Sequence, residues 1–286
     1  MPIDVLARAS PAANLALVGT VLVDTGGGVS DNADRVERFL AGRPVELIAL
    51  THGHLDHAGG AAELRDRLGA PIALHRADLA TLARDAARLH QPLTPFTVDR
   101  VLEDGDTLPG GIEVVGVPSQ TPGHVAYWVP AERTVLTGDL LQRDDVAWLP
   151  PDDGVIDAAI AAIGRLAALR PVRGIPGHGP DVTDVPRAVA ATIARYEQWR
   201  EHPDRQAWHA ARRIAAGRLS LEDPRPDLAG ATELLAAVPM LADFGAVLGL
   251  GAGALAAEVL RQLVGSGALG DDGGPLVTRF PHEPAA

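Results

Sequence analysis

The stretch that decides the fold is Thr51-His52-Gly53-His54-Leu55-Asp56-His57-Ala58-Gly59-Gly60, which directly follows the apolar segment 45–50. The apolar segment predicts a buried strand, and loops at strand ends commonly carry functional groups. Three imidazoles and a carboxylate crowded together are costly without a cation, whereas zinc and similar ions accept both ligand types. A solvated polar loop does not account for so many ligand-type residues in so short a stretch. We therefore predict a metal site after this strand.

Residues of the same chemistry recur later, each at a predicted strand end or glycine-containing turn. They are His124 after Thr121-Pro122-Gly123, Asp139 after Leu136-Thr137-Gly138, and His178 within Pro176-Gly177-His178-Gly179. Taken singly, each is explained as a structural turn residue or a helix cap. Taken together, they lie where several strands can deliver side chains to one edge. Five His and two Asp exceed the ligands of one tetrahedral zinc ion, so two ions are predicted.

The segments around these motifs alternate between strands and helices, which favours an α/β sandwich. Strands are expected at 15–23, 45–50, 71–74, 112–117, 124–129, 134–137 and 172–175, and helices at about 31–41, 61–68, 76–89 and 156–169.

Beyond about Pro186 the chain becomes rich in Ala, Leu and Arg, and strand patterns nearly vanish. Helices are expected at about 187–200, 204–217, 230–238, 240–248 and 253–265, followed by a small hairpin formed by 267–269 and 276–280. We therefore predict a catalytic domain over 1–185 and a mainly helical, winged-helix-like domain over 186–286.

The composition limits the chemistry that is available. The 286 residues include no Cys and no Lys, which excludes thiolate nucleophiles, sulfur-ligated zinc, Schiff bases and a phosphate-binding Walker lysine. The formal net charge of −12 disfavours nucleic acid and anionic membranes as partners. The apolar run 15–23 is too short to span a bilayer and is not a signal peptide. We expect a soluble, cytoplasmic protein that acts on a small molecule.

The motif order resembles the metallo-β-lactamase-fold hydrolases, and Asp24-Thr25-Gly26 is similar to that family's first motif. The resemblance covers about residues 14–181 and implies a four-layer αββα sandwich. It implies that His52, His54 and His124 hold one ion. It also implies that Asp56, His57 and His178 hold the second, and that Asp139 bridges both.

The resemblance also implies that Asp24 lies beneath the site and orients ligands, although a buried Asp that accepts from turn amides explains it nearly as well. Thr51 and Thr137 are candidates for the same role, although either can be an ordinary strand-end residue. The expected ions are Zn²⁺, with Fe or Mn as alternatives. Two such ions make hydroxide available at neutral pH, and Asp56 is a candidate for orienting this nucleophile or relaying its proton. Asp56 and Asp139 are therefore the candidate catalytic residues.

Two residues after the Asp139 motif are candidates for substrate contacts. Arg143 offers a cation, but a solvated loop arginine explains it as well. Trp148 can line a pocket or pack in the core. The bridging Asp139 and the lack of Cys make the chain similar to glyoxalase-II-like, lactonase-like and phosphodiesterase-like members of the family. The loop after Asp139 and the absence of a Lys for glutathione carboxylates depart from glyoxalase II itself.

The sequence thus predicts a dinuclear hydrolase of an ester, thioester or lactone of a small organic acid. A phosphodiesterase or endoribonuclease with the same ions, β-lactam hydrolysis and non-catalytic metal binding remain as alternatives. The C-terminal part resembles the tails of lactamase-like endoribonuclease relatives, but its expected recognition helix, 253–264, offers only Arg261 beside Glu258. We expect this part to be a packing lid or an element that forms a homodimer.

Overall fold

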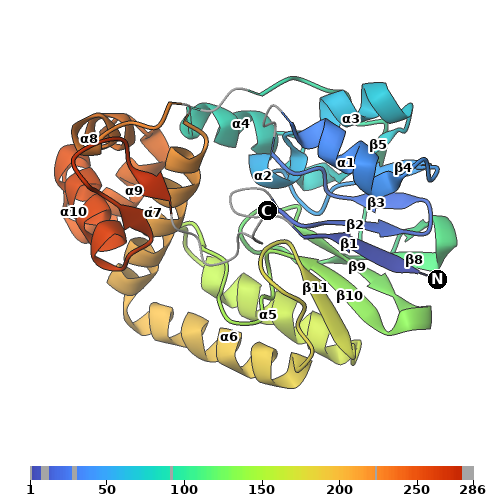
Figure 1. Ribbon diagram of the computed structural model, residues 1–286. Helices are drawn as coiled ribbons and strands as arrows, with labels where there is room; N and C mark the ends of the chain where they lie inside the picture. The colour runs from blue at the N-terminus through green and yellow to red at the C-terminus, as the bar shows by residue number, and fades with distance from the viewer. Residues whose placement is uncertain (1, 8–12, 28–30, 91–92, 223, 279–286) are drawn as a thin grey trace.

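The protein folds as two mixed sheets packed face to face, with helices on both outer faces and a helical C-terminal region beside them (Figure 1). The computed structural model describes residues 2–7, 13–27, 31–90, 93–222 and 224–278. The strand order is β1-β2-β3-β4-β5-β6 in one sheet and β11-β10-β9-β8-β7 in the other. The α/β sandwich expected from the sequence is confirmed.

The six-stranded sheet is built from the N-terminal part of the chain. Its strands are β1 (Ile3–Leu6), β2 (Leu15–Val18), β3 (Val21–Val23), β4 (Leu47–Ala49), β5 (Ile72–His75) and β6 (Arg100–Leu102). Its helices are α1 (Asn32–Leu40), α2 (Leu55–Ala58), α3 (Ala61–Leu68), the 3₁₀ turn η1 (Arg76–Asp78) and α4 (Thr81–Arg88). Strands β3 to β6 are parallel, so the segments that follow β3, β4 and β5 leave the sheet at one edge.

The five-stranded sheet follows. Its strands are β7 (Thr107–Leu108), β8 (Ile112–Gly116), β9 (Val125–Val129), β10 (Thr134–Gly138) and β11 (Arg173–Pro176), with 3₁₀ turns η2 (Pro109–Gly111) and η3 (Pro130–Glu132). Helices α5 (Val155–Ala168) and α6 (Val185–Glu201) cover its outer face. Strand β10 pairs with β9 in antiparallel and with β11 in parallel orientation.

Side chains that alternate along each strand fill two different apolar cores, one on each face of the sheet. In β2, Leu15 and Leu17 pack toward the helices of the first sheet, whereas Ala16 and Val18 pack into the space between the two sheets. A strand covered on both faces reads as a continuous apolar run. The prediction of one strand over 15–23 is therefore wrong. These residues form two antiparallel strands, β2 and β3, and the apolar run conceals the turn at residues 19–20 that joins them.

Other elements also differ from expectation. The predicted helix 76–89 is divided into the 3₁₀ turn η1, which ends at the buried Asp78, and α4, which begins at Thr81. Strands β1, β6 and β7 were not expected; they lie at or near the sheet edges, where short strands carry weak patterns.

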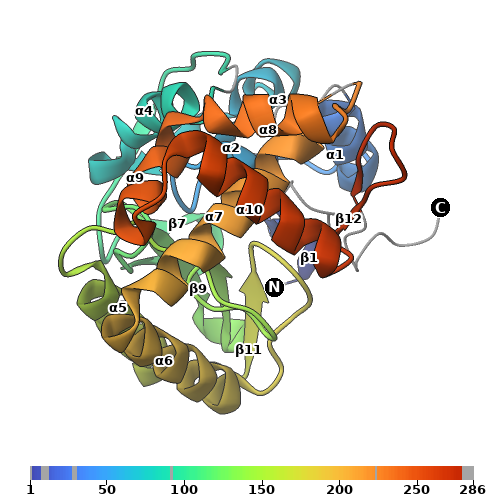
Figure 2. The same ribbon diagram turned by 90° about the vertical axis from the view of Figure 1, so that its left-hand side faces the viewer.

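The C-terminal region forms a helical cluster with its own apolar core, which faces the viewer in Figure 2. It contains α7 (Pro203–Ser220), α8 (Leu228–Ala236), α9 (Pro239–Leu248), α10 (Ala252–Gly265) and the hairpin of β12 (Leu269–Gly270) and β13 (Val277–Thr278). The predicted hairpin residues 279–280 lie outside the described ranges. Helix α6 packs on α5 in the sandwich core, and the division at residue 185 stays a prediction.

Within the described residues, no single helix has the length and apolar character needed to cross a membrane. Helices α8 and α9 are long and apolar enough only when they are taken together, and the chain bends by 86° between them.

Candidate metal centre

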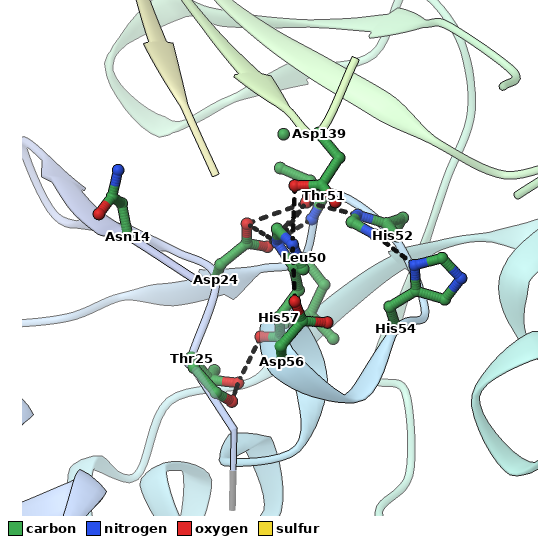
Figure 3. A network of polar contacts seen from close by, with 12 residues as sticks. Asn14, Asp24, Thr25, Leu50, Thr51, His52, His54, Asp56, His57 and Asp139 are labelled. Atoms are coloured by element: carbon green, nitrogen blue, oxygen red, sulfur yellow. Dashed lines mark hydrogen bonds and ion pairs between the residues drawn. The ribbon is translucent and has the colours of Figure 1, made fainter. Parts of the chain in front are cut away.

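All seven predicted metal ligands meet at one end of the sandwich, where strands of both sheets end. The motif that follows β4 supplies four of them from the first sheet, partly on the short helix α2. His124 precedes β9, whereas Asp139 and His178 follow β10 and β11 in the second sheet. Figure 3 shows Asp139 reaching from its strand toward the side chains of the first sheet.

Two overlapping clusters of ligand atoms lie at this edge. The ligand atoms of Asp56, His57 and His178 lie within 4.8 Å of one another, and so do those of His52, His57 and Asp139. His178 Nε2 lies 2.9 Å from Asp56 Oδ2, and 3.5 Å from Asp139 Oδ1. His57 Nε2 lies 3.1 Å from the same Asp139 oxygen. One carboxylate oxygen thus faces histidines of both clusters.

The remaining two histidines join the group through close contacts. His52 Nε2 and His54 Nδ1 are 3.0 Å apart, and the His52 and His124 rings lie 4.6 Å apart. The Asp139 backbone N–H donates to His124 Nε2 over 3.2 Å. The fold therefore brings together all seven residues that the sequence indicated, while their division between two ions stays a prediction.

The donor set fits divalent cations. Among the described residues, the buried His57 Nε2 and Asp139 Oδ1 lie 3.1 Å apart without forming a hydrogen bond, and the buried His124 Nδ1 has no hydrogen-bond partner, although such groups are normally satisfied. Burial would lower the pKa of His57, but the carboxylates of Asp139, Asp24 and Asp56 raise that pKa well above its usual value. The cluster therefore favours positive charge at its centre. Ligand atoms about 3 Å apart also suit zinc bonds of about 2.0–2.2 Å.

Burial sets the state of two other ligands. Burial and the neighbouring histidines His57, His124 and His54 hold the pKa of His52 well below its usual value. Burial lowers the pKa of His124 to about 3. Both rings are therefore neutral at physiological pH and have a lone pair to offer a metal ion.

Asp24 lies beneath the ligands, as the resemblance implied. Its Oδ1 accepts a hydrogen bond from the Thr51 backbone N–H at 2.7 Å, and the Thr51 hydroxyl contacts both carboxylate oxygens. Its Oδ2 lies 2.8 Å from His57 Nδ1, which leaves Nε2 directed at the cluster. Asp24 adopts φ = 59°, a left-handed conformation that Asp tolerates better than most residues. Figure 3 shows this arrangement.

Gly177 allows the second-sheet loop to approach the ligands closely. A Cβ atom at this position would lie 2.5 Å from His57 Cε1 and 2.8 Å from Asp139 Oδ1. No side chain fits there without displacing a ligand, which explains the glycine next to His178.

The other predicted residues have mixed outcomes. The Thr137 hydroxyl donates to Leu141 O at 2.8 Å, so it braces the loop after Asp139 and does not contact a ligand side chain. Arg143 pairs with Asp144 at 2.7 Å and lies in a separate hollow beside α6. Trp148 stacks on His54, with ring centroids 5.1 Å apart and an interplanar angle of 17°. Trp148 also packs against the C-terminal core and lines a cavity, whereas its role as a substrate contact stays a prediction.

Sequence reasoning missed two residues that contact the centre. Asn14 Nδ2 donates to Pro176 O at 3.0 Å and to Gly179 O at 2.8 Å, which holds the loop of His178. Asp85 Oδ2 lies 3.5 Å from His54 Nε2. Burial opposes ionisation of Asp85, but His54 and Arg84 lower its pKa to about 2. No local pattern marks either residue, because each meets the site only through the fold.

Several proteins similar to this chain are named as hydrolases or thioesterases. The chain is 33% identical over 144 residues to the probable metallo-hydrolase YybB of Bacillus subtilis, covering 46% of this chain and 60% of that protein. It is 27% identical to the thioesterase pkgB of Emericella nidulans, over 64% of this chain and 50% of that protein. It is also 27% identical to the hydroxyacylglutathione hydrolase GloC of Haemophilus influenzae, over 57% of this chain and 81% of that protein. The match therefore spans less than two thirds of the first two relatives.

Solved structures agree with the observed fold. A di-iron-bound form of TTHA1623 is 33% identical, with a TM-score of 0.57, over 66% of this chain and 96% of that one. The metallo-beta-lactamase family protein TTHA1429 from Thermus thermophilus is similar over 97% of this chain and 98% of that one, at 21% identity and a TM-score of 0.59. Residues 14–178, which carry all the candidate ligands, match the model of the metallo-beta-lactamase superfamily. The chain therefore belongs to this superfamily.

Proposed function

We propose that the protein is a dinuclear metal-dependent hydrolase that cleaves an ester, thioester or lactone of a small organic acid. The observation that carries the proposal is the pair of overlapping ligand clusters, with Asp139 Oδ1 within 3.5 Å of histidines in both. Two bound ions, Zn²⁺ in our proposal and Fe or Mn as alternatives, would lower the pKa of water and polarise a carbonyl oxygen.

The chain's own carboxylates have different tasks in this proposal. The Asp139 side chain is buried in one cluster, and its Oδ1 lies 3.5 Å from His178 of the other, so it supplies negative charge to both. The Asp56 side chain is 34% exposed and faces His178, so it can accept a proton from an attacking water and release it to the leaving group. Burial opposes ionisation of Asp56, but His57 and His178 lower its pKa, which keeps it an anion and a proton acceptor.

A cavity of about 510 Å³, lined by Asp85 and Trp148, which both contact His54, is our proposed substrate site. One wall is Trp148, which stacks on His54, and another is formed by Met240 and Phe244 of α9. The Phe244 ring meets the Trp148 ring edge-on, with centroids 6.3 Å apart. The C-terminal region therefore completes the cavity, and Figure 2 shows α9 next to α4.

The charges around the cavity favour an uncharged acyl substrate. Its lining includes four carboxylates, of Asp85, Asp152, Asp153 and Asp243, against the two arginines Arg84 and Arg88. Both arginines are already paired, Arg84 with Asp85 at 2.8 Å and Arg88 with Asp243. Such a lining repels the phosphates of RNA and the carboxylates of glutathione.

The relatives and the C-terminal helices support the same choice. Two relatives are named as a thioesterase and a hydroxyacylglutathione hydrolase, and both names denote thioester cleavage. In α10, Arg261 pairs with Glu258 at 2.5 Å, which leaves it poorly suited to hold a phosphate. A homodimer and a cytoplasmic location stay predictions.

A substrate panel tests the proposal. Aryl esters, uncharged thioesters, lactones, bis-aryl phosphodiesters and single-stranded RNA would be assayed with the metal-loaded protein, using Asp56→Ala as the control for contaminating activity. We expect turnover of at least one of the first three classes, and its loss in Asp56→Ala. Turnover confined to phosphodiesters or RNA would show that the acyl assignment is wrong.

The cavity makes a separate prediction about Trp148. Trp148→Ala is expected to lower kcat/KM about tenfold, mainly through KM, because an aromatic wall contributes about 0.5–1.5 kcal/mol beyond its buried area. Trp208→Ala is the matched control, since Trp208 packs against the same C-terminal core but does not line the cavity. Steady-state kinetics and metal content would be measured for both. Equal KM values in the two variants would argue against this cavity.

A further inference from the structure

Asp78 is a fully buried carboxylate that belongs neither to the candidate ligands nor to the proposed catalytic groups. It ends η1, directly after β5, and it accepts hydrogen bonds from two other segments of the chain. The Gly53 backbone N–H donates to Oδ2 at 2.8 Å, and the Gly123 backbone N–H donates to Oδ1 at 2.7 Å. The Thr121 hydroxyl donates to Oδ2 at 2.7 Å. A weaker contact from the Thr81 hydroxyl, at 3.4 Å, completes the set.

These donors lie next to candidate metal ligands. Gly53 separates His52 from His54, and Gly123 immediately precedes His124. The first loop follows β4 of the six-stranded sheet, whereas the second precedes β9 of the five-stranded sheet. One carboxylate therefore ties together two loops that belong to opposite sheets. Those two loops carry the three histidines expected to share an ion.

The second loop is packed directly against Asp78. A Cβ atom on Gly123 would lie 2.7 Å from both the backbone nitrogen and Oδ1 of Asp78. Any side chain at this position would push the loop, and His124 with it, away from the other ligands. The distance between the two loops is thus set by direct contact with Asp78.

A buried carboxylate is costly unless donors compensate for its lost hydration. Here the strong donors come from the ligand-bearing loops, so its stabilisation depends on those loops holding their present positions. Metal sites in turn require ligands held within about 0.5 Å of their bonding positions. We propose that Asp78 is a positioning residue that holds His52, His54 and His124 in register for one of the two ions. The inference rests on the two-ion site of the proposed function.

Cobalt binding to Asp78→Asn tests the inference without relying on activity. Asparagine keeps the shape, but it loses the charge and presents an amide N–H to one of the backbone N–H donors. The metal-free protein would be titrated with Co²⁺ against a competing chelator, and the visible absorption of the bound ion would be recorded. We expect one of the two affinities to fall about 10- to 100-fold with an altered spectrum, and the other to change less than about threefold.

Asp99→Asn is the matched control. Asp99 accepts a hydrogen bond from the Ile72 backbone N–H at 2.9 Å and pairs with Arg65 at 3.0 Å, so it anchors the opposite end of the same strand, β5. We expect this variant to lose stability in denaturant unfolding while both Co²⁺ affinities stay within about twofold of wild type. This result would separate a general loss of stability from a specific loss of ligand positioning.

The outcomes distinguish the inference from the proposed function. Wild-type protein that binds no Co²⁺ would contradict the two-ion site itself. Wild type that binds two ions, with Asp78→Asn binding both equally tightly, would overturn the role of Asp78 alone. If Asp78→Asn does not fold, Thr121→Val removes one donor and keeps the carboxylate. We expect Thr121→Val to weaken one ion about threefold or more, and unchanged binding in this variant would equally overturn the inference.

Discussion

Asp139→Asn is expected to lower kcat/KM by at least about 100-fold and to reduce the metal content below two ions per chain. Residues behind metal ligands already contribute about 10- to 100-fold, and Asp139 is placed among the ligands themselves. Its Oδ1 lies 3.1 Å from His57 Nε2 and 3.5 Å from His178 Nε2. The amide keeps the size of the side chain but removes the negative charge that both clusters share. Elemental analysis and steady-state kinetics on the best substrate of the panel would measure the two effects.

Asp145→Asn provides the control for this experiment. Asp145 lies in the same loop, but its carboxylate pairs with Arg213 at 2.9 Å near the surface. We expect activity and metal content within about twofold of wild type, because partly exposed ion pairs contribute little. An Asp139→Asn protein with full activity and two ions would contradict the assignment of Asp139 to the centre.

Removing the metal is expected to lower the free energy of unfolding by about 4 kcal/mol per ion when the free ion is at 1,000 times its dissociation constant. Without cations, the carboxylates of Asp24, Asp56 and Asp139 crowd around His57, and His178 also contacts Asp56 and Asp139. Denaturant unfolding of the protein before and after treatment with a chelator would measure the loss.

The Asp139→Asn variant supplies the internal control, since it is expected to bind metal poorly from the start. Its stability should respond to the chelator less than that of wild type, because it holds fewer ions to lose. Wild-type protein that releases all metal without any change in unfolding would show that the ions do not stabilise this fold.

Much of the centre was predictable because its signals are local. The motif from His52 to His57 places four ligands within one short stretch of chain, and the His124, Asp139 and His178 motifs each carry their own glycine turn. Helices such as α3 and α5 were predicted nearly to their observed ends, because their apolar periodicity is local too. The doubly buried β2 and β3 were read as one strand, since a run that is apolar on both faces conceals its turn.

Other features depend on packing between distant segments. The stacking of Trp148 on His54 and the contact of Asp85 with that ring arise only when the loops and α4 are in place. Asp78 looks like an ordinary residue at the start of a helix, yet the fold buries it between two loops.

The sequence by itself was enough to predict the candidate ligands and the family, because both depend on residue types at short spacing. The tertiary structure decided which side chains position those residues, which cavity lies on the other side of Trp148 and Asp85, and what charge that cavity presents. These properties depend on distances between residues far apart in the chain, such as Asp78 and Gly123, and such distances are fixed only when the two sheets and the C-terminal helices pack together.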